Sequence, residues 1–248
     1  MSVASVSLRS RHHHASGVPE LAEICRACNI VERLGGRFSL ELGIEVDRKA
    51  EEIDRWALAA TLLGDPSPVS VGISTYRVLE QAGVRTFEDV RARDREELVR
   101  LLDEGGYLRC DVHTVSRLLA LAEAIADRYA GRLALLGEEI MGASELERAL
   151  GALPGWDPVT VATFLRELRG VWPGADVPLD PRAALAARHV ALPSDRHGLS
   201  SLAAAAHLDF RDLEAGLARL ALCHGFAHCP GGEECPFAEA DREQFVHF

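Results

Sequence analysis

Apolar residues recur along this chain with the spacing of amphipathic helices. Over 50–63 and 111–130 they stand three or four positions apart, so that each set lies on one face of a helix. We predict further helices over 18–34 and, around Leu213 and Leu220, before a cysteine-rich segment. The sequence has no convincing alternation of apolar and polar residues of the kind that marks a half-buried strand. The pattern therefore predicts an all-α fold.

Proline and glycine interrupt this pattern often enough to divide the chain into about ten short helices. The long helices fall within 47–172, where we expect a helical barrel domain. Residues 1–46 and 173–248 would form a second helical lobe that contains the cysteine-rich C-terminal loop. The expected architecture therefore has two helical lobes with a cleft between them.

Composition narrows the classes of function. No apolar run is long enough for a membrane span and no N-terminal segment resembles a signal peptide, so we expect a cytoplasmic protein. The net charge of −11 argues against binding nucleic acid over the whole surface, although a local basic face is compatible with it. Lys49 is the only lysine, which leaves few amines for Schiff-base chemistry.

The segment 153–160, LPGWDPVT, predicts a tight turn that opens directly into a helix. Gly155 permits the backbone geometry that such a turn needs. Asp157 suits the N-cap position and Pro158 the first position of the helix. The backbone N–H groups of the turn and of the helix start could bind an anion, for which a DNA phosphate is the natural candidate.

Asp180 stands in a similar position one element later. It follows a Pro/Gly break and precedes a proline, as Asp65 and Asp157 also do where helices are expected to begin. Capping of a helix therefore explains this carboxylate without any chemistry. Its distance from the hairpin admits a second interpretation, in which the carboxylate acts on a bound substrate.

The hairpin and this carboxylate resemble the helix-hairpin-helix and Gly/Pro-Asp signature of the endonuclease III and MutY-like DNA glycosylases. Residues 153–156 and Thr160 match the family's hairpin motif, and residues 177–180 match the context of its catalytic aspartate. The similarity covers about 47–237. It implies the two-lobed helical fold of that family, with the hairpin at the cleft.

The resemblance also implies a function in base excision repair. The protein would be a monomeric DNA glycosylase that hydrolyses the N-glycosidic bond of a damaged or mismatched base flipped out of double-stranded DNA. Asp180 would be the catalytic carboxylate, activating water or stabilising positive charge at the sugar C1′. Bifunctional members place a Schiff-base lysine where this chain has Val159, so no lyase activity at abasic sites is expected.

The residues expected to contact DNA come from the hairpin and from one loop. Tyr107 follows two glycines, which favours an exposed side chain that could meet the strand, whereas core packing is the more natural role of Trp56, Tyr76 and Trp172. The expected contacts are Gly155, Trp156, Asp157, Val159, Thr160 and Tyr107.

One departure from the family pattern, together with the net charge, keeps other functions open. Asp157 replaces the second glycine of the hairpin motif, and its charge would lie near the proposed phosphate. Together with the acidic net charge, this favours a non-catalytic protein that binds distorted or modified DNA. A base- or nucleotide-modifying enzyme acting on another substrate is a further alternative.

The cysteines suggest a metal site. Cys223, Cys229 and Cys235 follow the spacing C-x5-C-x5-C, whereas many family members hold a [4Fe-4S] cluster with four cysteines spaced C-x6-C-x2-C-x5-C. Cys25 and Cys28 form a C-x2-C pair on the predicted N-terminal helix. Because the first helix joins the cluster lobe in the family, the resemblance implies a cluster held by Cys25, Cys28, Cys229 and Cys235.

Other ligand sets are compatible with the same sequence. Cys223 could replace one of the four cysteines, and His224 with His228 would suit zinc instead of iron. A loop without metal, in which the thiols are small buried groups, is the remaining alternative.

Overall fold

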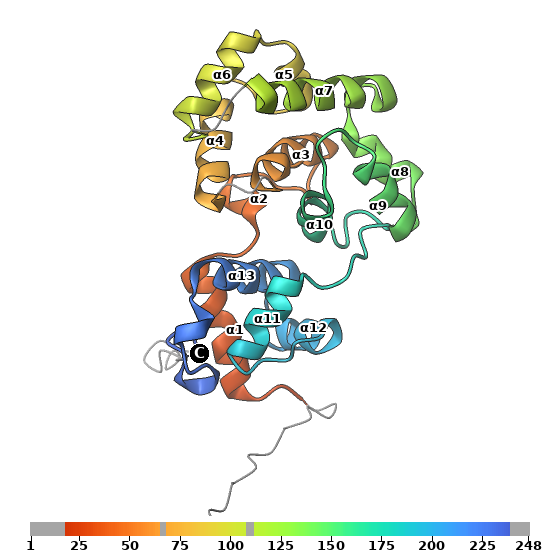
Figure 1. The fold of residues 1–248 in the computed structure, drawn as a ribbon. Coiled ribbons are helices and arrows are strands. Elements are labelled where there is room, and N and C mark those ends of the chain that lie inside the picture. The colour runs from red at the N-terminus through yellow and green to blue at the C-terminus, as the bar shows by residue number, and fades with distance from the viewer. Residues whose placement is uncertain (1–17, 65–67, 108–111, 239–248) are drawn as a thin grey trace, which may run out of the picture.

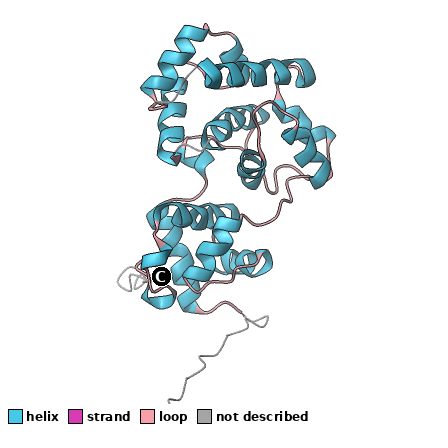
Figure 2. Ribbon diagram, in the orientation of Figure 1, coloured by secondary structure: helices cyan, strands magenta, loops and turns pink. Residues whose placement is uncertain are grey.

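Two separate groups of buried apolar side chains organise the fold. The helices that carry them are shown in Figure 1, with α1, α11, α12 and α13 below and the helices from α2 to α10 above. The computed structural model describes residues 18–64, 68–107 and 112–238. Apart from an isolated bridge between Arg169 and Trp172, the described residues form helices, turns and loops (Figure 2). The prediction of an all-α fold is confirmed, and no described helix is both long and apolar enough to cross a membrane.

The first core lies among the helices of the middle of the chain. The predicted helix over 50–63 is observed as Ala50–Gly64, and the one over 111–130 as Val112–Tyr129. Helix α3 is buried along most of its length, and the indole of Trp56 donates a hydrogen bond to the Phe164 carbonyl at 3.1 Å. The helices of this core are α2 (Phe38–Glu41), α3 (Ala50–Gly64), α4 (Val69–Gln81), α5 (Phe87–Arg91), α6 (Arg95–Glu104), α7 (Val112–Tyr129), α8 (Leu136–Glu139), α9 (Ala143–Gly151) and α10 (Pro158–Glu167).

The second core is smaller and joins the first helix to the last ones. Small residues dominate one face of α11, where Ala183, Ala186 and Ala187 are fully buried, so that α11 can approach α13 closely. The predicted N-terminal helix over 18–34 is observed as Leu21–Leu34. The helices of this core are α1 (Leu21–Leu34), α11 (Pro181–His189), α12 (Arg196–Ala205) and α13 (Phe210–Cys223).

Four large aromatic side chains are buried in the interior, as is usual for side chains of their size. Trp56, Tyr76, Trp156 and Trp172 are buried in the first core. Phe164 contacts both Trp156 and Trp172, with ring centroids 5.1 and 5.5 Å apart. The proposed division of the chain at residues 47 and 172 stays a prediction, and Asp65 lies outside the described residues.

A buried ion pair connects the two cores. Arg169, just after α10, makes two hydrogen bonds of 3.0 and 3.1 Å to the carboxylate of Glu214 on α13. Both side chains are almost inaccessible to solvent. Arg169 also donates to the carbonyls of Val177 and Pro178, and Glu214 accepts the backbone N–H of Asp180 at 2.9 Å. The pair therefore fixes the segment that leads from the first core into α11.

We predict that Glu214→Ala lowers the free energy of unfolding by about 3–5 kcal/mol, because it leaves the Arg169 charge buried without a partner. Urea unfolding followed by circular dichroism measures this loss. Arg91→Ala removes one side of an exposed pair with Glu123 and should change stability by less than about 1 kcal/mol. Equal losses in the two variants would contradict the role assigned to the buried pair.

Candidate functional site

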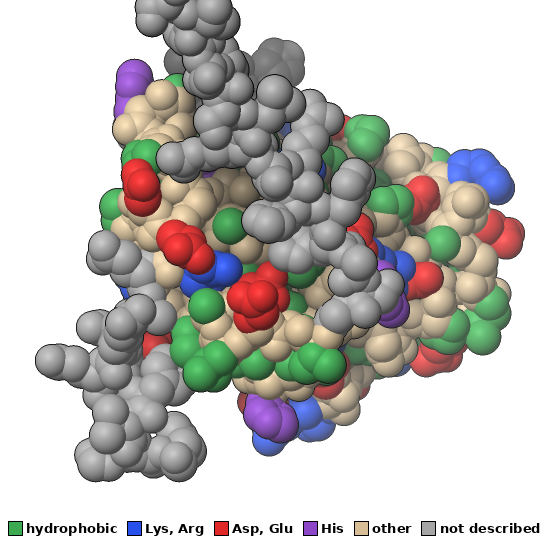
Figure 3. All heavy atoms as spheres, turned by 90° about the horizontal axis from the view of Figure 1, so that it is seen from below, with side chains coloured by type: hydrophobic (Ala, Val, Ile, Leu, Met, Phe, Trp, Pro, Cys, Tyr) green, Lys and Arg blue, Asp and Glu red, His purple; other side chains and the backbone are tan. Residues whose placement is uncertain are grey.

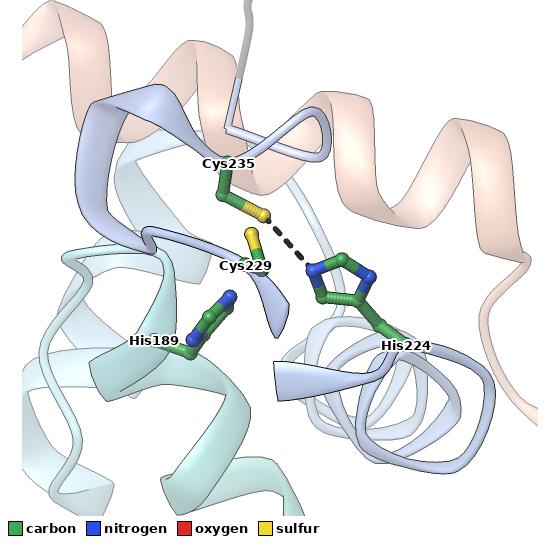
Figure 4. A group of neighbouring side chains, drawn as sticks. All are labelled: His189, His224, Cys229 and Cys235. Carbon is green, nitrogen blue, oxygen red and sulfur yellow. Dashed lines mark hydrogen bonds between the residues drawn. The ribbon is translucent and has the colours of Figure 1, made fainter. Parts of the chain in front are cut away.

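Four potential metal ligands meet in the second core (Figure 4). His189 is the last residue of α11 and His224 directly follows α13. Cys229 and Cys235 each follow a short 3-10 turn, Phe226–His228 and Gly232–Glu234. The four ligand atoms lie within 4.8 Å of one another, and the Cys235 Sγ is 3.5 Å from His224 Nε2.

This donor set fits a metal ion. Two thiolates and two imidazoles are the ligands of tetrahedral structural zinc sites. The Nε2 atom of His189 is buried and has no hydrogen-bond partner among the described residues. A buried polar atom without a partner lowers stability, and a metal ion would provide that partner. The four residues could therefore hold a metal.

A glycine lets the loop that carries Cys229 and Cys235, called the cysteine loop below, approach α11. Gly231 has φ 75° and ψ −172°, a backbone conformation that only glycine adopts readily. A Cβ at this position would lie 3.1 Å from the His189 carbonyl oxygen and 3.3 Å from its Nδ1. The loop can thus carry Cys229 and Cys235 up to the His189 ring only because residue 231 has no side chain.

Aromatic rings and helix α1 surround the four ligands. Phe226 stacks on His189 with centroids 4.3 Å apart, and Phe237 meets His224 at 5.0 Å. Arg33 of α1 donates to the Pro236 carbonyl at 2.7 Å and lies over the Phe237 ring. These contacts hold both ends of the cysteine loop.

Burial shifts the pKa of two of the ligands. It lowers the pKa of His189, and the neighbouring His224 adds to this effect. Burial raises the pKa of the Cys235 thiol, as does the adjacent Cys229. The imidazole of His189 is therefore held in the neutral form that binds metals.

The ligand set differs from the expected four cysteines. Cys229 and Cys235 belong to the group, but Cys25 and Cys28 do not. The Cys28 Sγ lies 3.9 Å from the carbonyl of Ala206, because this face of α1 is turned toward α12. The C-x2-C pair is thus separated from the cysteine loop by the orientation of its own helix.

The other ligand alternatives also change. Cys223 is exposed and lies outside the group, as does His228, whereas His224 belongs to it. Sequence reasoning missed His189 altogether, which lies 35 residues before His224 in the chain. No local pattern marks it as a ligand, and only the packing of α11 against α13 brings it to the site.

The helix-hairpin-helix is formed by α9, a turn and α10. Gly155 has φ +80°, as the tight turn requires. Asp157 caps α10 and accepts hydrogen bonds from the Thr160 backbone N–H at 2.8 Å and from its hydroxyl at 2.9 Å. Pro158 is the first residue of the helix. The local prediction for this segment is confirmed.

The expected DNA contacts divide into exposed and buried residues. Gly155, Asp157 and Val159 are exposed at the turn and the helix start. Trp156 is only 4% exposed and donates to Thr61 Oγ1 at 2.9 Å, and Thr160 is only 3% exposed. The side chains of these two residues therefore support the turn from inside.

Tyr107 corrects a sequence-based expectation. Instead of projecting toward solvent, its ring is buried, and its hydroxyl donates to the Leu62 carbonyl at 3.2 Å. Gly105 packs so closely on α4 that a Cβ would lie 2.4 Å from the Thr75 Cα. Gly106 then turns the chain with φ +97°, and this geometry directs Tyr107 into the first core.

Two arginines of α7 lie beside the hairpin turn. Arg117 Nη2 approaches the Gly155 carbonyl at 3.5 Å, and Arg128 donates to the Ala152 carbonyl at 3.3 Å. Both side chains are exposed. They concentrate positive charge at the turn of an otherwise acidic protein. On the face that Figure 3 shows, by contrast, basic side chains are scattered among acidic and apolar ones.

Asp180 caps α11 and is paired with two arginines. It accepts the Arg182 backbone N–H at 2.8 Å, the Arg166 Nη1 at 2.9 Å and the Arg182 Nη2 at 3.3 Å. Burial would raise the pKa of this carboxyl, but Arg166 and Arg182 outweigh it and hold the pKa below its ordinary value. The pairing therefore stabilises the fold near neutral pH, and this contribution is lost as the pH falls through the lowered pKa.

A pocket of about 820 Å³ lies between helices of the two cores. Its wall is formed by the ends of α1, α3 and α13 and by the starts of α4, α10 and α11. Asp157 and Val159 of the hairpin helix line it together with Arg182, the partner of Asp180. Most of the remaining wall is aliphatic. Its volume lies within the range of small-molecule sites, roughly 300–1,000 Å³.

We predict that Gly231→Ala lowers the free energy of unfolding by about 1–3 kcal/mol, since alanine is strained at this backbone conformation and would crowd His189. Gly225→Ala is the matched control in the same loop, where φ is −78° and a Cβ would meet no atom within 4 Å. Thermal and urea unfolding of both variants measure the difference. A Gly231→Ala protein as stable as the control would show that the close approach is not required.

Comparison of the chain with protein-family models, with curated proteins and with solved structures gives no match. The described residues nevertheless contain two candidate binding sites. One is the Cys/His group in the second core. The other is the pocket at which the hairpin helix and the α11 start meet.

Proposed function

We propose that the protein is a monofunctional DNA glycosylase that binds a flipped nucleotide in the pocket between α10, α11 and α13. One observation carries this proposal: the same pocket is lined by the start of the hairpin helix and by Arg182, which is bonded to Asp180. In a glycosylase, the groups that bind a DNA phosphate and the carboxylate that acts on the sugar must lie close enough to contact neighbouring parts of the same strand. The start of α10 and Arg182 share one pocket, and Asp180, which does not line the pocket itself, is hydrogen-bonded to Arg182; this arrangement supports the proposed function.

The hairpin would hold the DNA backbone. Pro158 has no N–H group, and the N–H groups of Trp156 and Thr160 are already bonded to Leu153 and Asp157. A phosphate would therefore meet the N–H groups of Gly155 and Val159, helped by the dipole of the helix. Arg117 and Arg128 add positive charge beside the turn. They offset the Asp157 carboxylate, which is occupied in capping Thr160.

Asp180 would act on the sugar of the flipped nucleotide. Loss of a base leaves positive charge on the sugar, and a nearby anion stabilises the transition state. The lowered pKa of Asp180 keeps its carboxylate ionised near neutral pH. This favours electrostatic stabilisation over general-base catalysis, which works best with a pKa near the working pH.

A Schiff-base step has no suitable amine in this pocket. Val159 occupies the exposed position at the start of α10 that faces the pocket. Lys49 lines a different hollow, next to Trp172. The proposed reaction is therefore hydrolysis of the N-glycosidic bond without cleavage of the strand.

The metal proposed for the Cys/His group is zinc. A [4Fe-4S] cluster is ordinarily held by four cysteines, whereas two cysteines and two histidines are a common zinc set. Zinc would cross-link the end of α11, the end of α13 and the cysteine loop. Its contribution is to the stability of the second core, since none of the four ligands lines the pocket.

One observation favours a second function, the non-catalytic binding of distorted or modified DNA. Both oxygens of Asp180 already accept hydrogen bonds, from Arg166 and from Arg182. In this alternative the carboxylate only caps α11, and the hairpin and the pocket bind DNA without releasing a base.

We predict that Asp180→Asn lowers the rate of base release by about 100-fold or more, because it removes the negative charge while keeping a good helix cap. The measurement uses duplexes with uracil, alkylated, oxidised or mismatched bases, assayed for abasic sites. Asp195→Asn alters a similar cap at α12 and should leave the rate unchanged. Release that survives Asp180→Asn would remove this residue from the mechanism, and tight binding without release by the wild type would favour the second function.

We predict one zinc ion per chain in protein purified without chelators, measured by elemental analysis. Cys229→Ser should reduce the zinc content and lower the midpoint of thermal unfolding, because it removes one of the four ligands. Cys28→Ser is the matched control and should retain zinc, since this thiol faces Ala206. Iron and inorganic sulfide in place of zinc would contradict the assignment.

A further inference from the structure

Arg166 is a buried arginine whose charge is directed at Asp180. Its side chain is 3% exposed, and its Nη1 lies 2.9 Å from Asp180 Oδ2. Among the described residues this is its one hydrogen bond, and its Nε atom is buried without a partner. The guanidinium also approaches the Phe38 ring, at 5.6 Å from the centroid.

Burying a charged guanidinium raises the free energy of the folded state unless other contacts compensate for the lost hydration. Removal of an arginine from water carries a large desolvation penalty, and a single ion pair seldom outweighs it. A well-packed apolar side chain of similar size would often stabilise the fold as much. Arg166 also interacts electrostatically with the buried carboxyl of Glu167, but Asp180 is the carboxylate to which it donates a hydrogen bond.

The second arginine at this carboxylate has a different setting. Arg182 is 40% exposed, and its guanidinium contacts to Asp180 are longer, at 3.3 and 3.4 Å. Because it lines the pocket, it can move when a ligand enters. Arg166 does not line the pocket, and its side chain is only 3% exposed. It is the fixed partner of the two.

Arg166 also connects the carboxylate to the hairpin. It lies on α10, nine residues after the cap Asp157, which corresponds to about 13 Å along a helix. Asp180 begins α11, the neighbouring element in the other core. The Arg166–Asp180 pair therefore links α10, whose start would bind a phosphate, to α11, which is capped by the carboxylate.

We propose that Arg166 is a positioning residue that fixes the Asp180 carboxylate in one orientation and relates it to the hairpin helix. This inference rests on the proposed glycosylase function. The charged groups around Asp180 are Arg166 on α10, Arg182 on α11 and Glu214 on α13, which accepts the Asp180 backbone N–H. The charge of Glu214 is balanced by its ion pair with Arg169. Arg166 is thus the buried cation that acts on the carboxylate directly.

The test combines kinetics with a measurement that needs no activity. Arg166→Gln is expected to lower kcat for base release by about 10- to 100-fold, with little change in KM, because a misplaced group affects the chemical step and not DNA binding. The acid limb of the pH–rate profile should move up by about one unit as Asp180 loses a cation. Arg166→Lys, which keeps the charge, should recover part of both effects.

The pKa of Asp180 is measured separately by carboxyl carbon NMR, with Asp180→Asn used to assign the signal. It should rise by about one unit in Arg166→Gln. Arg37→Gln is the control, since Arg37 is also buried but is paired with Asp47, Asp209 and Asp212 instead of Asp180. That variant should lose stability without changing the pKa of Asp180.

Each outcome bears on a different claim. If the wild type releases no base from any duplex, the proposed glycosylase function fails, and the role of Arg166 in that reaction fails with it. The NMR pKa then shows whether Arg166 still controls the Asp180 carboxylate. If the wild type is active, an unchanged pKa, or unchanged kcat in Arg166→Gln, would overturn the inference.

Discussion

The buried pair of Arg169 and Glu214 is the interaction on which the arrangement of the two cores depends. Arg169 lies two residues after the end of α10, and Glu214 lies in the first half of α13, so that the pair crosses from one core to the other. It also satisfies the Val177 and Pro178 carbonyls and the Asp180 backbone N–H. Without it, a segment rich in proline and glycine would have no fixed path between the cores. Together with the Arg166–Asp180 pair and the packing of α11 on α13, this contact sets the position of α11.

Both candidate sites lie on α11, at its opposite ends. Asp180 caps the start of the helix beside the pocket, and His189 ends it inside the Cys/His group. A helix whose buried face is alanine fits closely against α13 and can be held in one register. The second core is small, however, and small cores gain much of their stability from cross-links such as a metal. A zinc ion at the C-terminal end of α11 would therefore steady the carboxylate at its N-terminal end.

The charge distribution is unusual for a protein that is proposed to bind DNA. The net charge is −11, yet arginines gather at the hairpin turn and around Asp180. Binding that depends on a few local cations and on backbone N–H groups would be weak on undamaged DNA. Under the proposed function, discrimination would then come from the pocket, which would receive a nucleotide flipped out of the duplex.

The sequence alone determined the helices, because apolar spacing and the Asp-Pro caps are local properties. Helices α3 and α7, the turn at Gly155 and the cap at Asp157 were all predicted from a few neighbouring residues, and so was the burial of Trp56 and Trp172. Which side chains meet across elements was decided by tertiary packing. The metal ligands show this most clearly: no spacing relates His189 to Cys235, and the rotation of α1 turns Cys28 away from both. Tyr107 became a core residue only because Gly105 packs against α4, a contact that no local pattern encodes.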